Sequence, residues 1–211
     1  MSTLHLLGWR HALIAFAILF LFTFKAFSDD PEIALVIGEP YEDMRQRSSA
    51  YIPPALPGEI WFNIPDSDAR LNFIDPTYGF VTPLARFFTV IYDKGLINSV
   101  RMSPQIEPLL LDETLKVALD LQDQWRRTGW TSTRPDEFPP IAGTPAWQER
   151  IQQSRNGIKT YWQAGDQYQI MLMVGRFADS RHPGEERYLI SLSLAEPWVK
   201  PWEAYDTLAV P

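Results

Sequence analysis

The sequence predicts an α+β fold, with an N-terminal hydrophobic helix followed by antiparallel sheets packed against a few helices. Two observations support this class. Segments with helical periodicity begin and end with capping residues, and segments with alternating apolar side chains are joined by glycine-containing turns. The 211 residues are 45% hydrophobic and include eight tryptophans, which is ample for a packed interior.

The N-terminal apolar run, residues 12–24, predicts where the protein works. Arg10 precedes the run, and Lys25, Asp29 and Asp30 follow it. Its length suits a secretory signal, whereas a bilayer-spanning helix needs about 20 residues. A longer anchor over residues 4–27 fits equally well, because a basic side chain near the end of a span can reach the interface. Residues 1–28 are therefore interpreted as a signal peptide or a membrane anchor, with a buried helix of a cytosolic domain as the alternative.

The charge and the cysteine content limit the cellular compartments and the classes of partner that we expect for this protein. Positive charge before the apolar run predicts export of the rest of the chain. The net charge is −7, and this acidity argues against nucleic acid and against an anionic membrane surface as partners, while a basic protein is compatible. The absence of cysteine excludes disulfides, a thiol nucleophile and a lipoprotein anchor. These features favour the bacterial envelope, with the domain either anchored in the inner membrane or released into the periplasm.

The first half of the exported part, residues 29–106, is expected to form one α+β unit. Residues 29–33 are interpreted as a polar exit from the membrane, and Pro40 predicts the start of a short helix. Strands are predicted over residues 60–64, with Ile60, Phe62 and Ile64 on a buried face, and over residues 71–73. A hairpin is predicted over residues 86–102, with its turn at Asp93-Lys94-Gly95.

The second half, residues 107–211, is expected to form a second α+β unit. A helix is predicted from Asp112 as N-cap to Thr128, with Gly129 at the position after the helix. A shorter helix is predicted to begin at Thr144-Pro145, and antiparallel strands are predicted near residues 158–164, 168–174 and 188–194. The two units are interpreted either as a duplication or as one continuous domain, and no fixed-period repeat decides between these alternatives.

No set of catalytic residues is evident, and we expect no cofactor and no metal site. His182 is the only histidine beyond the leader, and its Arg-His-Pro-Gly context is typical of a solvated turn. Three close acid pairs have structural interpretations as a turn, a helix start and a solvated loop: Asp66 with Asp68, Asp112 with Glu113, and Asp136 with Glu137. An envelope hydrolase that uses one carboxylate pair is the rival hypothesis.

Aromatic residues in loops are the best candidates for binding a partner. Tyr78 and Phe80 lie in a Pro-Thr-Tyr-Gly-Phe segment, and Trp130 follows the predicted long helix. Arg127 lies near Trp130, and Trp, Tyr and Arg are preferred interface anchors. We therefore expect these four side chains to be exposed and to contact a protein partner, although Arg127 could instead stabilise the helix C-terminus.

Two segments carry a family resemblance. Leu35-Val36-Ile37-Gly38-Glu39-Pro40-Tyr41-Glu42-Asp43-Met44-Arg45 and the Phe88–Val100 hairpin resemble small outer-membrane-protein-assembly lipoproteins and β-lactamase-inhibitor-like domains. The chain departs from that pattern in lacking the lipid-modified cysteine and the glycine after the first helix. The resemblance implies a non-catalytic domain that binds proteins.

The expected function is accordingly a non-enzymatic exported protein-binding domain, acting as an inhibitor, an immunity factor or an envelope assembly accessory. Its partner would be another protein, such as a basic envelope-directed toxin or an envelope complex. Residues 12–24 would contact the membrane if they are not cleaved. Besides the hydrolase, a structural subunit of an inner-membrane complex is the other alternative.

Overall fold

The computed structural model describes residues 30–199, so the predicted leader helix lies outside the described residues. Residues 31–199 belong to one compact unit. The described residues form an α+β fold with three helices and two sheets, which confirms the predicted class. The elements are β1 (Glu32–Leu35), α2 (Tyr41–Arg47), β2 (Ile60–Asn63), β3 (Arg70–Phe73), β4 (Phe80–Val81), β5 (Phe88–Asp93), β6 (Leu96–Met102), α3 (Leu111–Arg127), β7 (Thr131–Thr133), α4 (Pro145–Gln153), β8 (Ile158–Ala164), β9 (Tyr168–Phe177) and β10 (Arg187–Ala195).

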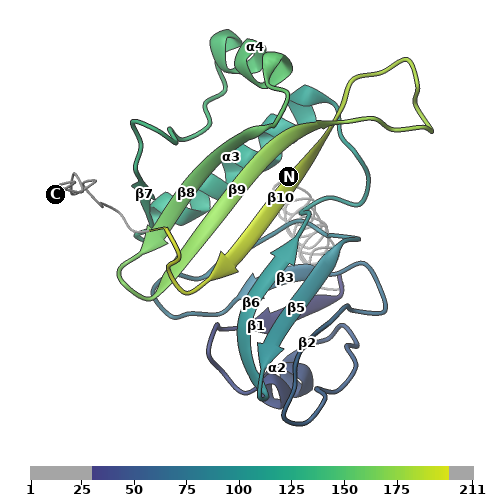
Figure 1. The fold of residues 1–211 in the computed structure, drawn as a ribbon, viewed down its shortest axis with the longest axis vertical. Helices are drawn as coiled ribbons and strands as arrows, with labels where there is room; N and C mark the ends of the chain where they lie inside the picture. The colour runs from purple at the N-terminus through teal and green to yellow at the C-terminus, as the bar shows by residue number, and fades with distance from the viewer. Residues whose placement is uncertain (1–29, 200–211) are drawn as a thin grey trace, which may run out of the picture. The chain divides into compact units, whose positions relative to one another are not determined.

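The larger sheet contains strands from both halves of the chain. Its order is β2-β5-β6-β10-β9-β8-β7, and all of its strand pairs are antiparallel. The link between the halves is the β6–β10 pair, in which Ser99–Met102 lies opposite Leu192–Ala195. Figure 1 shows β10 between β6 and β9. The segments 29–106 and 107–211 therefore share one sheet.

The smaller sheet corrects the expectation for the start of the domain. Residues 29–33 are not simply a polar exit segment, because β1 pairs in parallel with β3. Ile33 and Leu35 are fully buried opposite Leu71 and Phe73. β4 completes this sheet on the other side of β3. In the described part of the chain, no helix is long and apolar enough to span a membrane.

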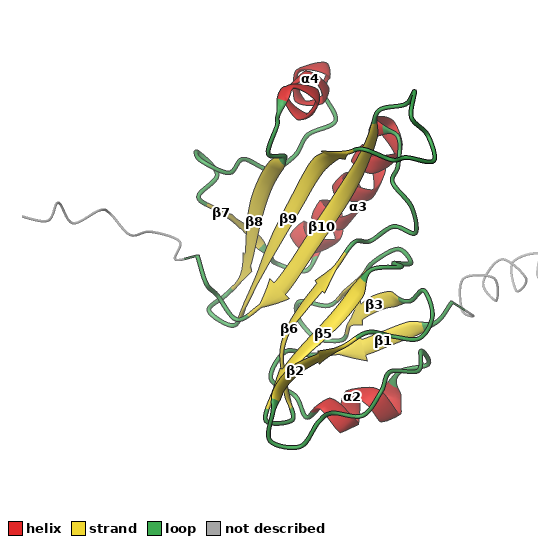
Figure 2. Cartoon of the chain, turned by 45° about the vertical axis from the view of Figure 1, so that its right-hand side comes forward, coloured by secondary structure: helices red, strands yellow, loops and turns green. Residues whose placement is uncertain are grey.

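Helix α3 connects the two sheets through an aromatic core. Figure 2 shows α3 across one face of β8, β9 and β10, and α3 also contacts β4. Its buried face includes Leu115 and Trp125. The Trp125 ring lies 5.8 Å from that of Phe80 in the smaller sheet and 5.7 Å from that of Trp162 in the larger sheet, measured between centroids.

Local capping and turn residues explain two elements that the sequence predicts. In the β5–β6 hairpin, Lys94 and Gly95 adopt φ values of 49° and 83°, as a tight two-strand turn requires. Helix α3 begins one residue before Asp112, which is therefore not the N-cap. Instead, the Glu113 carboxylate accepts a hydrogen bond from the Leu110 N–H at 3.2 Å, and Gly129 follows the helix with φ 85°.

Candidate protein-binding surface

β2 lies at one edge of the larger sheet (Figure 1), and exposed apolar side chains gather around it. β2 pairs with β5 on one side, and no strand within residues 30–199 pairs with its other side. We call the exposed apolar residues of β2, of the adjoining loops and of the neighbouring hairpin turn the β2 surface. Its members are Tyr51, Leu56, Ile60, Trp61, Phe62, Ile64 and Leu96. A concentration of this kind marks an interaction site more often than single exposed apolar residues do.

The β2–β5 register leaves alternate peptide groups of β2 without a partner strand. The Lys94 N–H donates to the Glu59 carbonyl at 3.1 Å, so Glu59 faces the β5 side. Hydrogen-bonded positions alternate along an antiparallel pair, which means that Trp61 also faces β5. The N–H and C=O groups of Ile60 and Phe62 therefore point away from the sheet, toward the open edge.

A partly buried polar contact fixes the position of β2. The Asn63 side-chain amide donates to the Tyr41 hydroxyl at 2.9 Å and to the carbonyls of Pro53 and Pro54 at 3.0 and 3.2 Å. The Tyr41 hydroxyl in turn donates to the Pro53 carbonyl at 2.9 Å. Burial raises the pKa of Tyr41 to about 12, so this phenol stays neutral over the physiological range. The edge strand is thus held in place by α2 and the preceding loop.

The prediction that Ile60, Phe62 and Ile64 face the core is wrong. Trp61 is 51% exposed and Phe62 is 46% exposed, although they alternate along the strand. Their rings stack at 5.5 Å with an interplanar angle of 12°. Ile60, Trp61 and Phe62 are exposed because β2 is a four-residue edge strand and because the contact of α2 with it, through Tyr41, is at Asn63, the end of the strand.

Acidic side chains lie at both ends of β2. Residues 48–69 contain no lysine or arginine and three acids. Asp68 pairs with Arg86 at 3.3 Å. Glu59 and Asp66 are exposed, and neither forms an ion pair within the described residues. The β2 surface is therefore apolar in its centre and negatively charged at its ends.

The expectation that the loop aromatics are exposed is wrong. Trp130 is 3% exposed and Phe80 is 4% exposed, both within the core. Gly129 turns the chain back after α3, and the Trp130 indole N–H donates to the Tyr78 carbonyl at 2.9 Å. The half-buried Tyr78 ring packs edge-on against Trp130 at 5.9 Å. Of the four candidates only Arg127 is exposed, so they do not form one surface patch.

A second feature is a cavity of about 400 Å³ beside the β9–β10 loop. Its apolar wall includes Phe87, Ile106 and Phe177, all of which are partly exposed to solvent. Glu107 and Arg181 contribute charge. This volume is within the range of small-ligand sites.

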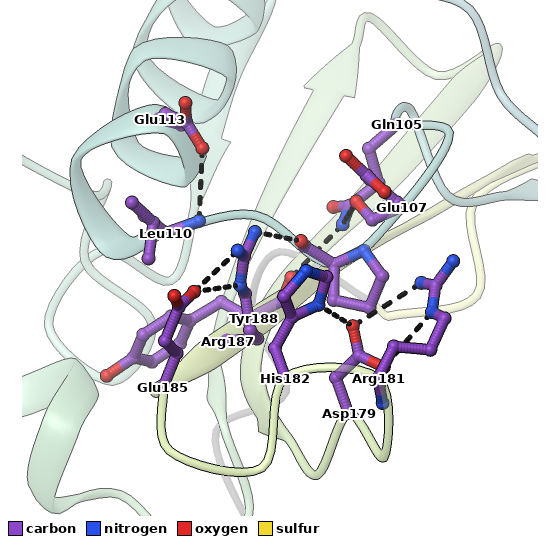
Figure 3. Close-up of polar contacts among 11 residues, drawn as sticks. Gln105, Glu107, Leu110, Glu113, Asp179, Arg181, His182, Glu185, Arg187 and Tyr188 are labelled. Atoms are coloured by element: carbon purple, nitrogen blue, oxygen red, sulfur yellow. Dashed lines mark hydrogen bonds and ion pairs between the residues drawn. The ribbon is translucent and has the colours of Figure 1, made fainter.

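Asp179 organises the loop at this cavity (Figure 3). Its carboxylate contacts the His182 Nδ1 at 3.0 Å and accepts hydrogen bonds from the Arg181 backbone N–H at 3.0 Å and side-chain Nε at 3.2 Å. The His182 contact first, and then the Arg181 N–H, hold the pKa of Asp179 well below its usual range. His182 is therefore a structural partner of Asp179 rather than a freely solvated turn residue. Within the described residues, its ring hydrogen-bonds to no hydroxyl group.

Gln105 attaches the other side of the cavity to β10 (Figure 3). Its side-chain carbonyl accepts from the Ile190 N–H at 2.8 Å, and its amide donates to the carbonyls of Tyr188 at 3.1 Å and Glu107 at 2.8 Å. The Ser103 hydroxyl adds a bond of 2.6 Å to the Ile190 carbonyl. The cavity wall is thus built from a loop that is fixed to the sheet.

The close acid pairs make structural contacts. Asp112 accepts a hydrogen bond from the Gln148 side chain at 3.1 Å. Glu137 forms an ion pair with Arg134, three residues earlier in the chain. Among the described residues, no group of three or more His, Cys, Asp or Glu side chains is arranged to hold a metal ion.

Comparison of the chain with protein-family models, with curated proteins and with solved structures finds no match in any of the three.

Proposed function

We propose that this protein is a non-enzymatic, exported protein-binding domain whose partner docks on the β2 surface. The observation that carries the proposal is the pair of stacked, half-exposed rings of Trp61 and Phe62 on an open edge strand. Tryptophan is the residue most typical of energetically important interface contacts. Because Asn63 fixes the strand, the rings are presented on a rigid support, which lowers the entropic cost of binding.

The proposed role is that of an inhibitor, an immunity factor or an envelope assembly accessory. The acidic composition and the carboxylates of Glu59 and Asp66 support a basic partner, such as an envelope-directed toxin. The proposed location, the periplasm or the periplasmic face of the inner membrane, rests on the sequence of residues 1–28. A reporter fused after Pro211 tests it, because activity of that reporter only in the cytosol would contradict export.

Affinity capture from envelope extract with the tagged full-length chain tests the function. We expect a stoichiometric protein partner whose affinity falls by more than about tenfold in Trp61→Ala, since truncation of a central anchor costs more than about 1.4 kcal/mol. Trp198→Ala is the matched control, because Trp198 is also exposed, at 45%, but lies beside Tyr161 of β8 at the other side of the sheet.

Three outcomes would contradict the proposal. The first is the absence of any stoichiometric partner. The second is a partner that binds Trp61→Ala as tightly as the wild-type chain. The third is turnover of a glycan or peptide by the purified protein that is lost when one carboxylate is replaced, which would favour the hydrolase hypothesis.

A further inference from the structure

We infer that the partner contributes an extended, basic segment that adds to the larger sheet as a strand beside β2. This inference rests on the proposed function and specifies how the partner binds and what chemistry its docking segment has.

The backbone of β2 supports strand addition. The N–H and C=O groups of Ile60 and Phe62 point toward the open edge, as the Lys94–Glu59 hydrogen bond and the strand register require. An edge of this kind is a template for an extended segment of another chain. Natural proteins usually protect such edges with lysine, proline or a bulge. Residues 60–63 contain neither lysine nor proline, and the register of β2 with β5 is regular.

The side chains of β2 would contact both faces of an added strand. Backbone alternation places the Cβ atoms of Ile60 and Phe62 on one face and that of Trp61 on the other, and the Trp61 and Phe62 rings lean from these opposite faces to stack at 5.5 Å. All three are at least 46% exposed. A docking segment would therefore gain apolar contact on both of its faces, which favours apolar residues flanked by charged ones.

The charge at the ends of β2 favours a basic segment over a second copy of this chain. Glu59 and Asp66 flank the strand without ion-pair partners in the described range. In an antiparallel self-association centred on β2, Glu59 of one copy would lie opposite Asn63 or Ile64 of the other, a few residues from its Asp66. Carboxylates of both copies would then gather at each end of the paired strands and repel each other, whereas lysine or arginine at the ends of a docking segment would be attracted.

Hydrogen exchange on the full-length chain tests this binding mode with a decapeptide of four central valines and three lysines at each end as the lysine–valine probe. We expect saturable binding that slows exchange of the Ile60 and Phe62 amides by about tenfold or more. The Trp61 and Asn63 amides serve as internal controls, because they already face β5 and should change little. The matched decapeptide with glutamate in place of every lysine should bind at least about tenfold more weakly.

A pair of variants separates the backbone contribution from the side-chain contribution. Phe62→Ala removes the ring and keeps the N–H, whereas Phe62→Pro removes both and leaves the β2–β5 hydrogen bonds intact. We expect Phe62→Pro to bind the probe about three- to tenfold more weakly than Phe62→Ala, which corresponds to one lost hydrogen bond. If Phe62→Pro does not fold, a probe N-methylated at alternate residues gives the same comparison with the wild-type chain.

Several results would overturn the inference. They are unchanged exchange at Ile60 and Phe62, equal affinity for the acidic probe, or equal affinity of Phe62→Pro and Phe62→Ala. A dimer in sedimentation that Phe62→Pro dissociates would identify a second copy as the occupant. Binding to phosphatidylglycerol vesicles that is lost in Trp61→Ala would identify a membrane.

The two proposals can fail separately. A captured partner that needs Trp61 but leaves the Ile60 and Phe62 amides unprotected would support the function and contradict strand addition. A chain that captures no partner but binds the lysine–valine probe at β2 would support strand addition and contradict the proposed function.

Discussion

The phenolic hydroxyl of Tyr41 accepts a hydrogen bond of 2.9 Å from the side-chain amide of Asn63. Tyr41 is fully buried in the first turn of α2, and Asn63 is the last residue of β2. This contact couples the core of the domain to the strand that presents Trp61 and Phe62. Substitutions at Tyr41 should therefore alter the position of β2 and the presentation of its exposed side chains.

The free energy of unfolding should decrease as the pH rises from about 10 to about 12. Burial raises the pKa of Tyr41 from its ordinary value of 10.0 to about 12. Above pH 10 the unfolded chain loses this proton and the folded chain keeps it, so the stabilisation is complete below pH 10 and is lost toward pH 12. The slope should reach up to about 1.4 kcal/mol per pH unit.

Urea unfolding of Tyr41→Phe at several pH values checks this prediction. The variant should show a flatter decrease than the wild-type chain over this range. Tyr188, whose pKa burial also raises to about 12, contributes in the same direction, so Tyr188→Phe should give a partial flattening. An unchanged slope in Tyr41→Phe would show that its phenol ionises freely in the folded state.

Trp130→Ala should destabilise the fold by about 3–5 kcal/mol, the usual cost of truncating a buried large aromatic side chain. The indole is 3% exposed and packs against Phe73 and Tyr78. Denaturant unfolding measures the loss, and Arg127→Ala, at an exposed position three residues earlier, should stay within about 0.5 kcal/mol of the wild-type chain. A Trp130→Ala protein with the stability of the wild-type chain would show that the indole does not support the core and would make Trp130 a candidate for partner binding again.

Leu115→Ala should cost about 2–5 kcal/mol, because Leu115 is 4% exposed on the face of α3 that packs against the sheets. Lys116→Ala, one position further along and exposed, provides the comparison and should have little effect. Equal unfolding midpoints for the two variants would mean that the Leu115 face of α3 does not pack in the core.

The acid sensitivity of the wild-type chain should exceed that of Asp179→Asn. Hydrogen bonding by His182 and Arg181 holds the pKa of Asp179 well below its ordinary value of 3.8. The carboxylate therefore stabilises the fold above that ordinary value, and the stabilisation is lost as the pH falls toward the folded-state pKa. Unfolding free energies below about pH 5 should fall less steeply in Asp179→Asn, and also in His182→Gln, which removes the main cause of the shift. If the free energy of unfolding falls equally steeply with decreasing pH in all three proteins, the Asp179 carboxylate does not contribute to the acid sensitivity of the fold.

Local signals in the sequence predict those elements whose conformation is determined by residues close to them in the sequence. The β5–β6 hairpin follows from its turn residues and from the alternation of Phe88, Val90 and Tyr92, all of which are buried. The helix α3 follows from its periodicity and from Gly129. β1 is different, because its strand conformation depends on parallel pairing with β3, whose residues are distant in sequence.

The binding surface could not be predicted because exposure of an aromatic residue depends on which strands pair. Trp61 and Trp130 both lie shortly after a turn glycine in the sequence, Gly58 and Gly129. Trp130 is covered by Phe73 of the smaller sheet and by Tyr78 of the loop between β3 and β4, while Trp61 lies on an edge that no described strand covers. The available signal was the sequence Ile60-Trp61-Phe62, which places apolar side chains on both faces of a short strand.

The position of β10 determines when the larger sheet can close. It is the last strand of the described chain, but it lies between β6 and β9, and its contacts reach back to residues such as Ser103, 87 positions before Ile190. Until the ribosome has produced residues 187–195, both neighbouring strands lack a partner on that side. Such long-range pairing also makes folding slow. Closure of the sheet must therefore follow synthesis of its final strand, and until then the β2-β5-β6 part and the β9-β8-β7 part stay unjoined.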